Sequence, residues 1–230
     1  MHLFGGDKGK MLFRCSSRPK QFSRRLGRSA SSFRAVAPSS SRHLALPLAF
    51  LAVKGWDSHG TKDWEDWISR FAARGYSSLL LEVDPAAAPS ASLDGLESEL
   101  IRLLRDPSAS SPFPPLLFAS SGSSLIAEQY VSSHPLSGLC LVDPVNSSSA
   151  HKLLPRFFPK PLDDFNYEPG FPITVVESVK KEADEEHRLV REFGPQEGED
   201  EEDALVRRIQ GERDEAGWQK VMDWMDENSL

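Results

Sequence analysis

Short apolar runs alternate along this chain with stretches of helical periodicity, and this alternation limits the fold more than any other feature. The runs at 46–53, 78–83, 115–119, 138–142 and 173–176 are almost continuously apolar. Strands of a parallel sheet that helices cover on both faces have this pattern. A weaker run at 204–209 predicts a sixth strand.

Between these runs the apolar residues recur at helical spacing. Trp64, Trp67, Ile68 and Phe71 stand at i, i+3, i+4 and i+7, and Gly75 follows as a stop signal. Four further helices are expected at 93–105, up to about 134 after the third run, near 183–193 and at 217–227. About six strands and five helices predict an α/β domain with a mostly parallel central sheet flanked by helices.

Charge divides the chain into two parts. Residues 1–43 hold ten Lys or Arg and one acid, Asp7, so this head carries +9, whereas the total net charge is −7 and the remaining chain carries −16. Such a polyanion repels nucleic acid and anionic lipid, so neither is expected as a partner of residues 44–230. The acidic C-terminal third leaves docking to a basic protein surface as an alternative role.

The head is rich in Ser and Arg and poor in acids, with scattered apolar residues. This composition is typical of a transit peptide, so we expect import into the mitochondrial matrix and an α/β domain over 44–230. The alternative is a disordered basic tail over 1–43, including one that binds RNA. The apolar stretch 44–53 is too short to span a bilayer. With only two cysteines, Cys15 and Cys140, no disulfide framework is expected.

The segment from Phe118 to Ile126 carries the clearest chemical signal. An apolar strand runs into the small residues Ser120 to Ser124 and then into a helical pattern, which places Ser121 at a sharp strand-to-helix turn. This resembles the nucleophile elbow of the α/β-hydrolase superfamily, with Ala119 and Ser123 where that family usually has Gly. The order of the strands from 46 to 227 resembles the same family, in particular its mitochondrial type known from fungi.

The resemblance implies a set of roles. Ser121 would be the nucleophile toward a small carboxylic ester or thioester, and Gly122, with Gly55 and Trp56 of an earlier loop, would stabilise the oxyanion. The acid would follow a late strand, where the sequence offers Asp184, Asp143 and Glu177. Asp143 is also interpreted as a strand-end turn. The irregular segment 146–172 would form a short lid.

The general base is the missing member of this set. The family carries its histidine after the last strand, yet no histidine follows His187. His187 is therefore the remaining candidate base, and its alternative interpretation is a solvated helix residue. A serine hydrolase acting through Ser121 and a catalytically inactive binding or assembly module both remain open. No phosphate loop, dinucleotide fingerprint or zinc spacing is present, so no cofactor or metal is expected.

Overall fold

Seven strands form one sheet in the order β1-β3-β2-β4-β5-β6-β7. The computed structural model describes residues 30–56, 60–107, 111–178, 186–195 and 204–230. The strands are β1 (Ser32–Val36), β2 (Pro47–Val53), β3 (Ser77–Val83), β4 (Leu116–Ser120), β5 (Gly138–Val142), β6 (Ile173–Glu177) and β7 (Val206–Gln210). Only β1 is antiparallel to its neighbour. The sheet confirms the expected α/β class.

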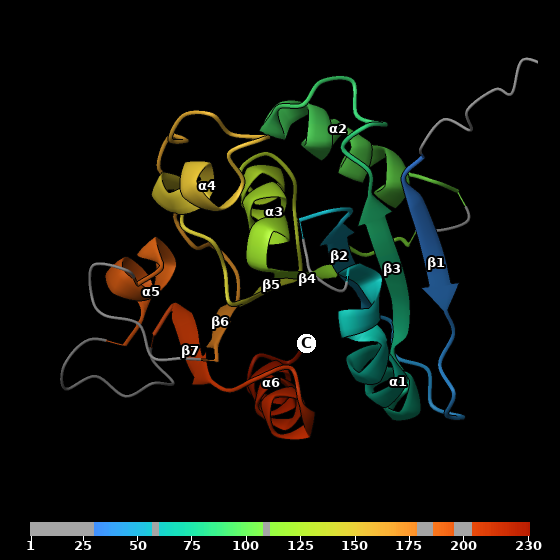
Figure 1. The fold of residues 1–230 in the computed structure, drawn as a ribbon. Helices are drawn as coiled ribbons and strands as arrows, with labels where there is room; N and C mark the ends of the chain where they lie inside the picture. The colour runs from blue at the N-terminus through green and yellow to red at the C-terminus, as the bar shows by residue number, and fades with distance from the viewer. Residues whose placement is uncertain (1–29, 57–59, 108–110, 179–185, 196–203) are drawn as a thin grey trace, which may run out of the picture.

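Helices cover both faces of this sheet (Figure 1). They are α1 (Glu65–Arg74), α2 (Leu93–Leu104), α3 (Ser124–Val131), α4 (Ser147–Leu153), α5 (Arg188–Phe193) and α6 (Glu215–Glu227). Helices α2, α3 and α5 contribute to one apolar cluster, and α1 and α6 contribute to a second cluster on the opposite face. No helix in the described ranges is both long and apolar enough to cross a bilayer.

The continuous apolar strands follow from this two-sided cover. In β2, Ala49 and Leu51 pack in the cluster with α2 and α3, whereas Leu48 and Phe50 pack in the cluster with α1 and α6. Phe50 stacks on Phe118 of β4 with ring centroids 4.5 Å apart. Because neighbouring residues of a strand point to opposite faces, both faces need apolar side chains.

Two elements were not predicted. Strand β1 lies inside the segment 1–43 that was expected to be a transit peptide or a disordered tail, and it pairs with β3 from Ser32–Glu82 to Val36–Ser78. Just before it, the hydroxyl of Ser31 accepts a hydrogen bond from the amide of Asp84. The folded domain therefore begins before the predicted boundary at residue 44. Helix α4 forms in the segment 146–172, which was expected to be irregular.

Candidate functional site

The predicted elbow is present at the carboxyl end of β4. Ser120 ends the strand, a 3₁₀ turn spans Ser121–Ser123 and α3 begins at Ser124. Ser121 has φ +47°, in the left-handed region that costs a residue with a Cβ about 1–2 kcal/mol. Its hydroxyl makes no hydrogen bond to any residue that the structure describes. Backbone strain and an unbonded hydroxyl are what an exposed nucleophile needs.

Serine hydroxyls fix this turn where the family uses glycine. The Ser123 Oγ donates to the carbonyl of Ser120 (2.6 Å) and accepts from the amide of Ser120 (2.9 Å). The Ser124 Oγ donates to the carbonyl of Ser121 (2.7 Å) and accepts from the amide of Val145 (3.1 Å). Ser123 is fully buried. Its hydroxyl therefore satisfies polar backbone groups that the sharp bend leaves unpaired.

The expected oxyanion donors are only partly available. The amide of Gly122 lies in the first turn of the helix, where amides have no helical carbonyl to bond. The amide of Trp56 donates to the carbonyl of Val53 (3.1 Å), so in this conformation it is already bonded within its own turn. Gly55 takes φ +80° in the same loop, and its Cα faces open space.

Apolar side chains cover the elbow. A Cβ on Gly122 would lie 3.1 Å from the Cδ1 of Leu154 and 3.3 Å from the ring of Trp56. The Trp56 ring also packs against Phe157 and Phe158, with centroids 5.2 and 5.4 Å away. Leu154 and the Trp56 ring therefore cover Gly122, and the residues after α4 pack on that ring. The indole Nε1 of Trp56 is buried and has no hydrogen-bond partner among the described residues.

Two of the candidate acids, Asp143 and Glu177, lie in the described part of the chain, each at the end of a strand. Asp143 follows β5 with φ +46°, and its Oδ1 accepts hydrogen bonds from the amide (2.8 Å) and hydroxyl (3.0 Å) of Ser178. It joins the ends of β5 and β6, which agrees with a strand-end turn. Glu177 is fully buried, and its carboxylate lies 2.9 Å from the guanidinium of Arg208. Asp184 lies outside the described residues.

His187 is neither solvated nor close to the elbow. It is 2% exposed at the start of α5, and its Nε2 lies 3.0 Å from the Oε1 of Glu128, which is 2% exposed too. Its Nδ1 accepts from the amide of Leu189. Glu128 is seven residues beyond Ser121 on α3, about 10 Å along the helix axis. His187 therefore joins two helices, and its solvated interpretation is wrong.

Arg213 stands in the loop after β7, where α/β-hydrolases carry their histidine. Its Nη1 donates to the Oγ of Ser120 (3.0 Å) and its Nη2 lies 3.0 Å from the Oδ2 of Asp63. The guanidinium also lies over the ring of Trp64, 5.4 Å from the centroid. Sequence reasoning missed this residue, because an isolated arginine in a polar loop is usually a surface charge. A guanidinium only donates hydrogen bonds, so it cannot take a proton from a serine.

One other histidine lies on α4, within the segment 146–172. His151 is on α4, one turn before Leu154, and its Nδ1 is buried without a hydrogen-bond partner in the described part of the chain. His134 stacks on Tyr130 at the far end of α3. His2 and His59 lie outside the described residues. Among the described residues no cluster of His, Cys, Asp or Glu is arranged to hold a metal ion.

Comparisons with known proteins place the chain only at the level of the fold. No model of a protein family matches the sequence, and no curated protein matches it. Among solved structures, an α/β serine hydrolase without a lid from Xanthomonas campestris has a TM-score of 0.46 at 12% identity, covering 64% of this chain and 65% of that one.

A carboxyl esterase from Bacillus coagulans has a TM-score of 0.40 at 17% identity, with 55% and 44% of the two chains covered. An epoxide hydrolase from Bacillus megaterium has a TM-score of 0.39 at 13% identity, covering 53% and 42%. The chain spans less than two thirds of the length of these proteins. Similarity at this level says nothing of activity, but the strand order and the elbow are those of an α/β-hydrolase fold.

Proposed function

We propose that this chain is a catalytically inactive protein of the α/β-hydrolase fold that works as a binding module. The observation that carries the proposal is the position of Arg213, which fills the loop after β7 and bonds to Ser120 and Asp63. Without a base, a serine hydroxyl is a poor nucleophile near neutral pH. Loss of the base in a serine triad lowers the rate by several orders of magnitude.

Labelling with a fluorophosphonate probe tests this proposal. We expect the purified chain and its Ser121→Ala variant to give the same background signal. An adduct that forms in the wild type and disappears in Ser121→Ala would refute the inactive assignment. The Ser132→Ala variant, which removes a hydroxyl from the other end of α3, is the matched control.

A second candidate function is hydrolysis of a small ester or thioester through Ser121. The left-handed backbone and the hydroxyl of Ser121, which bonds to no described residue, favour it. So does the Nδ1 of His151 on α4, which has no hydrogen-bond partner among the described residues. If labelling occurs, the variants His151→Ala and His59→Ala identify the base. Loss of labelling in one of them, with unchanged unfolding by urea, assigns that histidine.

Import into mitochondria is part of the same proposal. The sheet limits where a presequence can end, because Ser32–Val36 pairs with β3 and Ser31 bonds to Asp84. We propose that cleavage occurs before Ser31. N-terminal sequencing of the protein from isolated mitochondria tests this, and a mature N-terminus within or beyond β1 would contradict it.

Docking of the acidic C-terminal third to a basic partner is a weaker proposal, which co-purification at low salt tests.

A further inference from the structure

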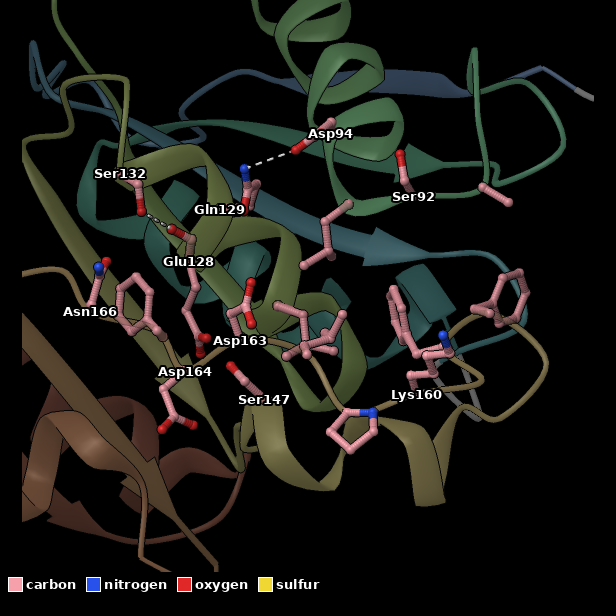
Figure 2. Close-up of a pocket in the computed structure, with 18 of the residues that line it drawn as sticks. Ser92, Asp94, Glu128, Gln129, Ser132, Ser147, Lys160, Asp163, Asp164 and Asn166 are labelled. Carbon is pink, nitrogen blue, oxygen red and sulfur yellow. Dashed lines mark hydrogen bonds between the residues drawn. The ribbon is translucent and has the colours of Figure 1, made fainter.

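A cavity separate from the elbow lies beside α3. Its walls come from the start of α2, from one side of α3 and from the segment 157–166 that follows α4 (Figure 2). Its volume is about 630 Å³, within the range of about 300–1,000 Å³ that small-molecule sites occupy. Ser121 and Gly122 are not among its lining residues. The ligand class that this cavity fits must therefore be inferred from its own lining residues.

Apolar and aromatic side chains form much of the wall. Leu93 comes from α2 and Leu125 from α3, and Phe157, Phe158 and Phe165 come from the opposite segment. An aromatic ring presents a negative face to a cation, which makes such rings a common wall for organic ammonium groups. These walls favour a ligand with an apolar body.

The charged residues of the lining are mostly acidic. Four acidic residues, Asp94, Glu128, Asp163 and Asp164, and one basic residue, Lys160, are among the lining residues, and Figure 2 labels all five. The two neighbouring aspartates, Asp163 and Asp164, are exposed and form no ion pair with any described residue. The excess of negative charge disfavours an anionic ligand and attracts a cation.

Hydrogen bonds fix part of the cavity lining. Glu128 is fixed by the Nε2 of His187 at 3.0 Å, and Asp94 accepts from the side-chain amide of Gln129 at 3.2 Å. On the opposite side, the guanidinium of Arg188 donates to the carbonyl of Phe165 at 2.8 Å. These three lining groups are already fixed, so they lose little entropy when a ligand binds.

We propose that this cavity binds an amphipathic organic cation, a small molecule with an ammonium group and an apolar body. The ammonium would lie among Asp163, Asp164 and the phenylalanine faces, and the apolar body against Leu93 and Leu125. This inference rests on the proposed binding function and names its ligand class. Packing contacts join the cavity wall to the elbow. Phe157 and Phe158 of the wall pack on the Trp56 ring, and that ring covers Gly122.

Calorimetric titration of the full chain with benzyltrimethylammonium at low salt tests the proposal. Benzenesulfonate of similar size is the matched anionic probe. We expect saturable binding of the cation and none of the sulfonate. Absence of cation binding, or sulfonate binding of equal strength, would overturn the inference.

Variants locate the site. The double variant Asp163→Asn with Asp164→Asn should weaken cation binding about tenfold or more, since two unpaired carboxylates are removed. Glu168→Gln removes a charge from the same segment outside the cavity lining and should leave binding within about twofold. Equal binding by the double variant would place the cation elsewhere and refute the site.

The two proposals fail separately. Cation binding that survives alongside a Ser121-dependent adduct would overturn the inactive assignment and keep the cavity as a cation site. No cation binding in a chain that also forms no adduct would overturn the cavity alone. Unfolding by urea, measured on each variant, separates loss of binding from loss of fold.

Discussion

Replacing Arg213 by leucine should destabilise the fold strongly, because one side chain holds three partners. Its Nη1 bonds to the Ser120 hydroxyl at 3.0 Å, its Nη2 lies 3.0 Å from Asp63, and its guanidinium lies over Trp64. The Arg213 side chain is 26% exposed and that of Asp63 15% exposed, so solvent screens the pair only in part.

The expected loss follows from these contacts. A hydrogen bond from a charged donor contributes about 1.5–3 kcal/mol. A cation over an aromatic ring adds roughly 0.5–2 kcal/mol. After discounting for partial exposure, we expect Arg213→Leu to lower the free energy of unfolding by about 3 kcal/mol. For a domain of this size that corresponds to a fall in Tm of about 6–12 °C.

Urea unfolding of Arg213→Leu, Asp63→Asn and the double variant measures both the loss and the pairwise coupling. We expect a coupling free energy of about 1 kcal/mol between the two residues. Arg213→Lys keeps the charge but loses the bidentate geometry, so it should fall between the wild type and Arg213→Leu. A loss under about 1 kcal/mol for Arg213→Leu would refute the idea that this arginine fixes the late loop against the elbow.

Three further predictions follow from the same structure. In urea unfolding, Ser121→Gly should leave the free energy of unfolding unchanged or raise it by up to about 1 kcal/mol, whereas Ser121→Val should lower it by about 2 kcal/mol. The reason is that only glycine takes φ +47° without strain. Equal stability of the two variants would refute the strained turn. His187→Ala should cost about 3 kcal/mol and couple to Glu128→Ala in a double-mutant cycle, since both side chains are buried; an additive cycle would contradict the pair. Burial raises the pKa of the Cys140 thiol far above its usual range, so in a Cys15→Ser variant no thiol should react with a disulfide reagent at pH 8 until the chain is unfolded; reaction of the native chain would contradict that burial.

The sequence predicts the parts of the fold that continuous apolar runs or strong helical periodicity encode. Strands β2 to β6 and helix α2 lie within two residues of their predicted bounds, and α1 ends at the predicted stop, just before Gly75. Strand β1 was missed, because its five residues are exposed or half-buried at the edge of the sheet and stand in a basic, Ser-rich context. Helix α4 was missed, because Ser147 to Ser149 favour turns as much as helix.

The candidate site was predictable in its backbone but not in its partners. The run of small residues after β4 predicts the turn at Ser121, and the absence of a histidine after His187 predicts an incomplete catalytic set. The pairing of His187 with Glu128 joins residues 59 positions apart, and the bond from Arg213 to Ser120 joins residues 93 apart. Local patterns carry no information on such contacts. One signal was present, since Glu128 stands on a helix in which five of the other seven residues are apolar.

We propose that Ser121 has the backbone of a nucleophile but that no residue in the described part of the chain acts as its base. Mass spectrometry of the intact protein during incubation with p-nitrophenyl acetate, alongside release of p-nitrophenol, tests it most directly. We expect release no faster than from the Ser121→Ala variant and no acetyl group on Ser121. A burst of p-nitrophenol equal to the protein concentration, with acetylation mapped to Ser121, would contradict it.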